Sequence, residues 1–340
     1  MKQSSLTRRA FLRRTCLLGA GTLCLAGAGA PFSVLAAMSD KGLTERQTRL
    51  LMGTMVSLAA VCDDQARVAE AFAAAFAEME RLITIFDRHT PSSALSVLNT
   101  QGSLPKAPAE LSSVLQASLV LGKTTGFAFN PAILPALELF EKRGAHNQPH
   151  FDHHDLGEAL ALARPGEIEL AGNDIRFGLQ GMRITLDGIA KGFIADAASD
   201  VLSAHGVANH MVNAGGDIRV RVAEHSKRPW TIGIRHPEKA GDILASVRMT
   251  RGGIATSGNY ERAFDRSRSK HHLINHATGK SPDIASLSVK AENAMQADAL
   301  ATALSLMPPT EALRYVELRT TASCLIVDRF GRRFASSRWG

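Results

Sequence analysis

The segment at residues 184–192 constrains the fold of this chain most. In it an apolar run is followed by one tight turn and then by a helical pattern. The spacing predicts a short strand over residues 182–186, a turn at Asp187-Gly188 and a helix over residues 189–205. Lys191 falls in the first turn of that helix. A helix start offers unpaired N–H groups and partial positive charge, so this segment predicts a phosphate-binding end.

A second feature lies far downstream, in an apolar helix that is expected over residues 294–307 as the last helix of the chain. Asp298 and Thr302 stand four residues apart there, which places both on one helix face. A carboxylate and a hydroxyl are oxygen ligands of the kind that Mg²⁺ prefers. The two features together predict a nucleotide diphosphate held between a helix end and a metal ion.

The remaining pattern predicts an α+β fold, because helical runs alternate with strands that look antiparallel. Helices are expected over residues 67–86, 111–123 and 133–143, and strands over 50–62, 210–212, 218–222, 230–234 and 243–249. The strands at 218–222, 230–234 and 243–249 are expected to share one sheet. Hairpins are expected around Gly172-Asn173 and, closing the chain, around Gly331, and residues 146–164 are expected to form an irregular surface insertion.

The N-terminus resembles a twin-arginine export signal over residues 1–37, with Arg8-Arg9 ahead of a Gly/Ala-rich apolar stretch and small residues near Ala36. A membrane anchor is the alternative, but the stretch is short and contains Pro31. The signal predicts passage through the twin-arginine translocase to the periplasm. It also carries five basic residues before the first acidic one, Asp40. The net charge of +7 therefore does not indicate that the rest of the chain binds nucleic acid.

Cys62 and Cys324 are the two cysteines beyond that signal, and both lie in apolar runs. They could pair in an oxidising compartment or act as small buried hydrophobic residues. We expect them to be unpaired.

Several familiar site patterns are absent. Gly122-Lys123-Thr124 lacks the first glycine of a P-loop, and no G-x-G-x-x-G follows a strand. Ser257 follows Ala255-Thr256, so it does not form a nucleophile elbow. The histidines between residues 146 and 154 lie in a polar loop without zinc-ligand spacing, and we interpret them as solvated.

Seven short motifs occur in order from about residue 50 to the end, and as a set they resemble the FAD:protein FMN transferases, the ApbE family. They are Met52-Gly53-Thr54, Ser93-x-Leu95-Ser96-x-Leu98-Asn99, Gly188-Ile189-Ala190-Lys191-Gly192, Asn213-Ala214-Gly215-Gly216-Asp217, Thr256-Ser257-Gly258-Asn259-Tyr260-Glu261-Arg262, His272-Leu273-Ile274-Asn275-x-x-Thr278-Gly279 and Ala297-Asp298-Ala299-Leu300-Ala301-Thr302-Ala303. The start of the chain resembles the branch associated with nitrous oxide respiration. The resemblance implies one transferase domain over residues 38–340, with FAD in a cleft between two halves.

The resemblance also implies the chemistry: Mg²⁺-dependent cleavage of FAD, transfer of FMN to a Thr or Ser hydroxyl of an exported acceptor with a Ser/Thr-Gly-Ala-Thr motif, and release of AMP. The FAD-lining residues that it implies are Met52, His89, Ala128, Phe129, Asn130, Lys191 and Leu273. Asp298, Thr302 and the Gly188 carbonyl would hold the metal. Lys191 would offset the pyrophosphate charge, and His272 is the candidate base for the acceptor hydroxyl.

Some positions depart from the family pattern. Thr185 stands where many relatives have an aspartate, so that FAD contact is either lost or taken over by Asp187. Asn130, Asn275-His276 and Ala301 also replace expected residues, which predicts altered metal binding. Two other functions stay open from the residues alone: a flavin carrier without catalysis, and an FAD pyrophosphatase.

Overall fold

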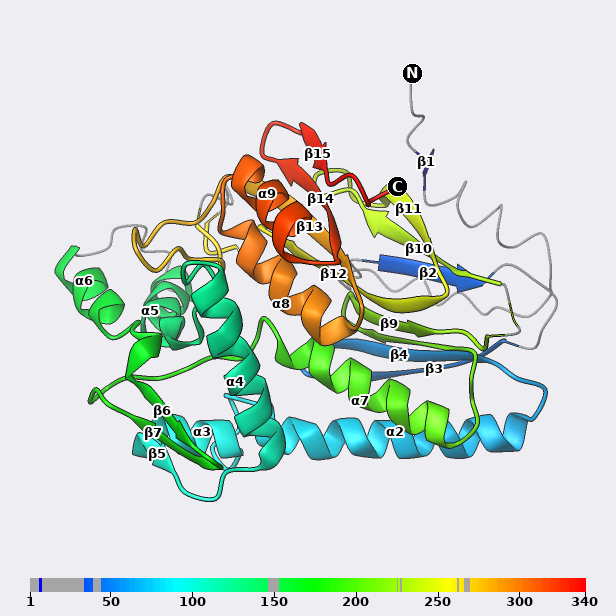
Figure 1. Ribbon diagram of the computed structural model, residues 1–340, viewed down its shortest axis with the longest axis horizontal. Coiled ribbons are helices and arrows are strands. Elements are labelled where there is room, and N and C mark those ends of the chain that lie inside the picture. Colours follow the sequence, from blue (N-terminus) through cyan, green and yellow to red (C-terminus); the bar gives the residue numbers. More distant parts are fainter. Residues whose placement is uncertain are drawn as a thin grey trace.

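An eight-stranded antiparallel sheet forms the centre of the protein, in a computed structural model that describes residues 6–7, 34–38, 44–145, 153–224, 226, 228–261, 263–265 and 270–340. Its strand order is β15-β14-β13-β12-β9-β8-β4-β3 (Figure 1). The strands are β3 (Thr44–Leu51), β4 (Thr54–Val61), β8 (His210–Ala214), β9 (Asp217–Arg221), β12 (Arg251–Gly258), β13 (Ile284–Ala291), β14 (Ser323–Asp328) and β15 (Arg333–Ala335). Every strand pair in the described residues is antiparallel, which confirms the predicted α+β class.

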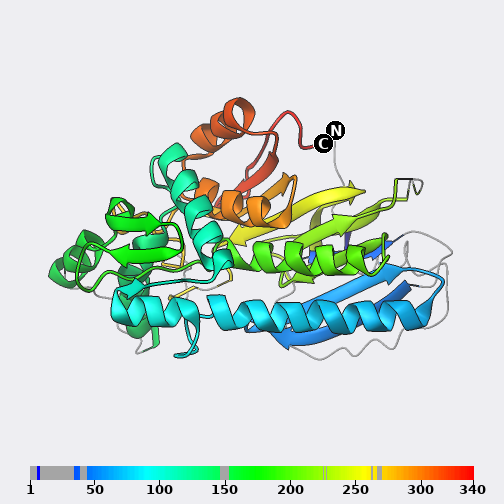
Figure 2. The same ribbon diagram turned by 60° about the horizontal axis from the view of Figure 1, so that its bottom comes forward.

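Three helices cover one face of this sheet: α2 (Gln65–Phe86), α7 (Ala190–Ala204) and α8 (Ala294–Ser305) (Figures 1 and 2). The apolar positions of α2 recur at helical spacing, from Val68 to Phe86, and they pack into one core with α7, β4 and β8. Asp64 caps α2 by accepting a hydrogen bond from the Arg67 N–H. The predicted helices over residues 67–86, 189–205 and 294–307 are confirmed to within two residues at each end.

A second sheet, of order β1-β11-β10-β2, covers the opposite face. Its strands are β1 (Leu6–Thr7), β2 (Val34–Met38), β10 (Trp230–Arg235) and β11 (Asp242–Met249). Buried residues of β10 and β11, with Trp230 the largest, pack against β9 and β12. The prediction that residues 218–222 share a sheet with 230–234 and 243–249 is therefore wrong. Alternation shows that a strand has a buried face, but it does not show which strand lies beside it.

A smaller, helix-rich part lies at one end of the main sheet, at the left of Figure 1. Its helices are α3 (Ala94–Gln101), α4 (Ala109–Thr124), α5 (Leu134–Ala145) and α6 (His153–Ala161), with short 3₁₀ turns at Pro131–Ile133 and Pro165–Glu167. Strands β5 (Ser103–Leu104), β6 (Ile168–Ala171) and β7 (Asp174–Phe177) form a three-stranded sheet. The predicted hairpin at Gly172-Asn173 is confirmed. The prediction of an irregular segment at residues 146–164 is wrong where α6 forms, and residues 146–152 lie outside the described residues.

Three further predictions about elements are wrong. Residues 50–62 are not one strand, because Met52 and Gly53 both adopt positive φ and turn the chain between β3 and β4. Residues 182–186 are extended but join no sheet; the Asn99 side chain bonds the Ile184 N–H and C=O, in place of a neighbouring strand. The helix at 294–305 is not the last, because α9 (Pro309–Arg319) follows it.

The expected export signal falls largely outside the described residues. Within the described part of the chain, no helix combines the length and the apolar character that a membrane crossing needs. Cys62 and Cys324 are both free, as expected from the sequence.

Candidate active site

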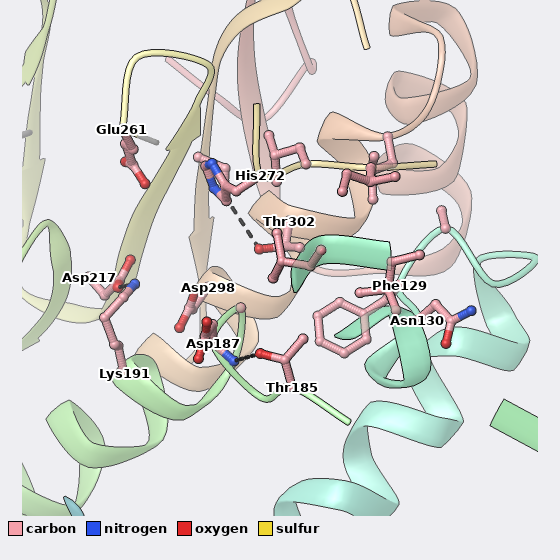
Figure 3. Close-up of a pocket in the computed structure, with 18 of the residues that line it drawn as sticks. Phe129, Asn130, Thr185, Asp187, Lys191, Asp217, Glu261, His272, Asp298 and Thr302 are labelled. Atoms are coloured by element: carbon pink, nitrogen blue, oxygen red, sulfur yellow. Dashed lines mark hydrogen bonds and ion pairs between the residues drawn. The ribbon is translucent and has the colours of Figure 1, made fainter. Parts of the chain in front are cut away.

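One cavity lies where the helix-rich part meets the main sheet, and Figure 3 shows its lining. The empty space is about 920 Å³, including the part open to solvent. It is lined by Ala128, Phe129, Asn130, Ile133, Leu137, Thr185, Asp187, Gly188, Lys191, Asp217, Thr256, Ser257, Glu261, His272, Leu273, Ile274, Asp298, Thr302 and Leu306. Ten of the twelve residues that the sequence singles out are therefore brought to one place.

The turn before α7 forms one wall of this cavity. Thr185 Oγ1 accepts a hydrogen bond from the Asp187 N–H (3.2 Å), and α7 begins two residues after Gly188 without a side-chain cap. Its Gly192 N–H donates to Asp298 Oδ2 at 3.1 Å. One N–H group of the helix start, expected to face a phosphate, thus binds a carboxylate of α8 instead.

Lys191 projects from the first turn of α7 and forms an ion pair with the buried Asp217, while 33% of its own side chain stays exposed (Figure 3). Burial by itself would lower the pKa of Lys191, but the charges of Asp217, Asp298 and Glu261 outweigh it and raise that pKa. Lys191 is therefore a permanently charged cation at the cavity. Asp217 was not among the site residues predicted from the sequence, although it ends the motif at residues 213–217.

Asp298 is the most buried carboxylate of the cavity, with 3% of the residue exposed. Burial raises its pKa, the neighbouring Asp217 raises it further, and Lys191 opposes both effects. Thr302 lies one helical turn later, as predicted, and its Oγ1 is 3.5 Å from Ser257 Oγ. A Cβ on Gly188 would lie 2.7 Å from Thr302 Oγ1, so only glycine lets the turn approach α8 this closely.

These residues fit a hard cation for which water or substrate supplies most of the ligands. Asp298, Thr302 and the Gly188 backbone are oxygen donors from two adjoining segments. No group of three or more His, Cys, Asp or Glu side chains within the described ranges is arranged to hold a metal by itself. A donor set with one carboxylate therefore suits Mg²⁺ that also binds substrate phosphates, and it does not suit a closed zinc site.

The loop at residues 126–130 forms the opposite wall. Gly126 and Phe127 both have positive φ, which is strained for a phenylalanine, and Phe129 is buried against the cavity. Asn130 lines the cavity too, but its amide binds backbone: Oδ1 accepts from the Ala132 N–H and Nδ2 donates to the Ala163 carbonyl. Asn130 therefore shapes this wall rather than offering a free polar group.

His272 and Leu273 reach the cavity from the segment after β12, and Figure 3 shows His272 on the same side of the cavity as Glu261. Glu261 was missed as a site residue, although it belongs to a quoted motif; Arg262 of that motif lies outside the described residues. The neighbouring His271 is fully buried and binds the Pro282 carbonyl through Nε2 at 3.2 Å. Burial lowers the pKa of His271, so this residue supports the segment as a neutral ring.

Met52 and His89 are not among the residues that line the cavity. Met52 lies in the β3–β4 turn with φ of 52°, and that turn adjoins the Gly215–Gly216 turn, since a Cβ on Gly215 would lie 2.6 Å from Thr54. The His89 N–H is bound to Asp87 at the end of α2. Their contacts with FAD stay predictions.

Comparison with known proteins gives consistent matches over most of the chain. Residues 52–326 match the sequence model of the ApbE family. An FAD:protein FMN transferase from Treponema pallidum is 32% identical over 298 residues, which are 78% of this chain and 82% of that protein. One from Klebsiella pneumoniae is 29% identical over 235 residues, 68% of this chain and 71% of that protein.

Solved structures show the same fold. The crystal structure of an ApbE protein from Thermotoga maritima superposes with a TM-score of 0.78 at 26% identity, covering 87% of this chain and 97% of that one. The apo form of a flavinyl transferase ApbE from Pseudomonas stutzeri gives 0.74 at 21% identity, over 87% and 95% of the two chains.

Proposed function

Because this chain belongs to the ApbE family of FAD:protein FMN transferases, we propose that it transfers FMN from FAD to a Thr or Ser hydroxyl of an acceptor protein, with Mg²⁺, and releases AMP. The observation that carries the proposal is the joint placement of Lys191, Asp298 and Thr302 at one cavity. These residues come from two helices more than a hundred positions apart in the chain.

The charge of the cavity supports a requirement for a cation. Four carboxylates line it, from Asp187, Asp217, Glu261 and Asp298, against the single ammonium of Lys191. A pyrophosphate would be repelled from such a site unless a cation entered with it. Mg²⁺ held by Asp298, Thr302 and the Gly188 carbonyl would supply that charge and polarise the phosphoryl oxygens.

The chain's own residues then have distinct roles. Lys191, fixed by Asp217, would face the pyrophosphate as a cation. His272 would accept the proton of the acceptor hydroxyl while the oxygen of that hydroxyl bonds to the phosphorus of the FMN half. The bond from that phosphorus to the bridging oxygen breaks, and AMP carries the oxygen and its electron pair away.

A direct assay tests this function against its alternatives. The purified protein is mixed with FAD, Mg²⁺ and a peptide bearing a Ser/Thr-Gly-Ala-Thr motif. Covalent flavin fluorescence on the peptide is the expected result. Free FMN with AMP would indicate a pyrophosphatase, and unchanged FAD would indicate a carrier; either would contradict the proposal.

His272→Ala tests the base. We expect transfer to fall by about 10²–10⁴-fold while FAD still binds, because general base catalysis contributes that much. Retention of full transfer would remove His272 from the mechanism. Glu70→Gln, on the exposed face of α2 and outside the cavity lining, is the control variant.

We also propose that the protein acts in the periplasm after twin-arginine export, as its Arg8-Arg9 motif supports. Replacing both arginines by lysine should retain the protein in the cytoplasm, measured by cell fractionation. Periplasmic protein at wild-type levels would contradict this route.

A further inference from the structure

Arg88 is a buried cation that the chemistry described above does not use. It follows the end of α2 and has only 4% of its side chain exposed. Its Nε donates to Asp187 Oδ2 at 2.9 Å and its second guanidinium nitrogen donates to Glu141 Oε1 of α5 at 2.8 Å. One guanidinium thus joins three segments around the cavity: the α2 end, the turn before α7, and α5.

The partner of Arg88 lies on the cavity wall. Asp187 lines the cavity directly before Gly188, and Figure 3 shows it in the same turn as Thr185. The carboxylate that was expected to contact FAD is therefore held by an arginine. Burial would lower the pKa of Arg88, but Asp187 and Glu141 outweigh it, so the arginine stays charged.

The pairing of Arg88 with Asp187 matters because the proposed substrate brings a negatively charged pyrophosphate into the cavity. Lys191 is already matched by Asp217, and Asp298 and Glu261 add two further negative groups. An Asp187 carboxylate without its arginine would repel a pyrophosphate at short range. It would also lose the contact that holds it against the α2 end.

We propose that Arg88 is a positioning residue for FAD, acting through Asp187: it offsets the carboxylate charge and fixes the turn at residues 185–189 that receives the pyrophosphate. This inference rests on the proposed use of FAD at this cavity. It assigns Arg88 no contact with the reacting atoms.

The experiment measures the Kd for FAD by flavin fluorescence and the KM and kcat of transfer at saturating Mg²⁺, all with the full chain. Arg88→Gln should raise Kd and KM about tenfold or more and change kcat less than twofold. Arg88→Lys should recover part of the loss, since it restores the charge but not the two-pronged geometry. Arg81→Gln is the matched control: Arg81 of α2 also binds two carboxylates, Glu78 and Glu110, but neither partner lines the cavity, and the expected change in KM is below twofold.

The decisive variant combines Arg88→Gln with Asp187→Asn. If Arg88 acts by offsetting Asp187, the double variant should bind FAD more tightly than Arg88→Gln, and it should match Asp187→Asn alone. Binding by the double variant tenfold weaker than by Asp187→Asn would show that Arg88 acts independently of Asp187 and would overturn the proposal. The comparison of the double variant with Asp187→Asn also holds if Arg88→Gln alone fails to fold. The double variant leaves no unmatched charge at position 187.

Failure of the proposed function is a separate outcome. It would appear in the wild-type protein as the absence of Mg²⁺-dependent transfer, whereas the role of Arg88 is tested by FAD affinity. An unchanged FAD Kd in a folded Arg88→Gln protein would refute the positioning role even if wild-type transfer is normal.

Discussion

At the scale of single residues, the cavity is defined by charged groups whose partners come from other elements. Lys191 is matched by Asp217 of β9, and Asp298 accepts from the Gly192 backbone. Each of these groups would be costly to bury alone. Their mutual arrangement keeps a charged lysine and an acidic donor set at the same surface, which is the combination that a metal–pyrophosphate complex requires.

Thr302→Val is predicted to weaken Mg²⁺ binding specifically. Valine keeps the shape that packs on Gly188 but removes the hydroxyl, so the Mg²⁺ concentration for half-maximal transfer should rise about tenfold. Thr302→Ser, which keeps the hydroxyl, is the control and should stay close to wild type. Equal Mg²⁺ dependence in both variants would exclude Thr302 as a ligand.

His210 is predicted to make stability depend on pH. This fully buried ring donates from Nδ1 to the Val207 carbonyl (2.6 Å), so its Nε2 accepts from the Ser199 hydroxyl (2.7 Å) as a neutral ring. Burial lowers its pKa to about 4. Since the unfolded chain takes up the proton near pH 6.5, the folded state loses stability as pH falls from 6.5 toward 4.

The expected loss from this group is about 2 kcal/mol between pH 8 and pH 5, measured by urea unfolding at both values. His210→Gln removes the titrating ring, so its stability should fall less over the same interval. If the two proteins show the same pH dependence, His210 is not the responsible group.

At the scale of elements, α7 is held against β9 by a series of ion pairs. Alternate residues of β9 face successive turns of α7: Asp217 pairs with Lys191, Arg219 with Asp196 at 3.4 Å, and Arg221 with Asp200 at 2.8 Å. At the cavity end the helix supplies the cation and the strand supplies the carboxylate, whereas the other two pairs have the opposite arrangement. This series fixes the register of α7 and therefore the position of its first turn.

The junction between α7 and α8 fixes the second half of the site. Asp196 of α7 accepts hydrogen bonds from the Ala294 and Met295 N–H groups at the start of α8, at 2.9 and 2.8 Å. The helices also approach closely, because a Cβ on Gly192 would lie 2.3 Å from the Ala294 carbonyl oxygen. The distance between Lys191 and Asp298 thus depends on a glycine and a helix cap.

Gly192→Ala is predicted to destabilise the protein by about 2 kcal/mol or more and to impair transfer, because the methyl group has no space between the helices. Gly157→Ala is the matched control: Gly157 is also helical, nothing lies within 4 Å of its added Cβ, and alanine favours the helix. Thermal unfolding and the transfer assay measure both variants. A Gly192→Ala protein as stable as Gly157→Ala would refute the close contact.

At the scale of the whole molecule, the main sheet keeps the two cysteines of the described residues apart. Cys62 follows β4 and Cys324 lies in β14, and the strand order places five inter-strand steps between these strands. At about 4.8 Å per step they are roughly 24 Å apart, whereas a disulfide requires Cα atoms within about 7 Å.

We therefore predict that a reducing agent leaves the thermal unfolding midpoint unchanged. The measurement compares unfolding with and without dithiothreitol, using Cys62→Ser as the control that could not form this bond. A decrease of several degrees on reduction in the wild type alone would contradict the sheet order.

Much of the fold could be predicted because its helices carry clear local signals. The apolar positions of α2 and the lysine-bearing start of α7 follow a helical period that neighbouring elements do not alter. The errors have two kinds of cause. The segment at 182–186 is bonded by Asn99, eighty-five residues earlier, which is a non-local contact. Residues 50–62 contain a local turn, in which Met52 adopts a positive φ that is uncommon for a residue other than glycine.

The residues of the site likewise divide into those that local motifs identified and those that depend on contacts between distant segments. The order of motifs identified Lys191, Asp298, Thr302 and His272 as a set, because the residue types and the spacing within each motif are properties of the sequence. The partners Asp217, Glu261 and Arg88 could not be found from spacing, since each acts across more than twenty residues of intervening chain.

The sequence by itself therefore determined which chemical groups are available, which helices carry them and which family the chain resembles. Only the tertiary structure decided which carboxylate neutralises which cation, and that Met52 and His89 lie outside the cavity lining. The physical reason is that helical periodicity is a local property, whereas ion pairing and burial depend on segments that the chain brings together only when it folds.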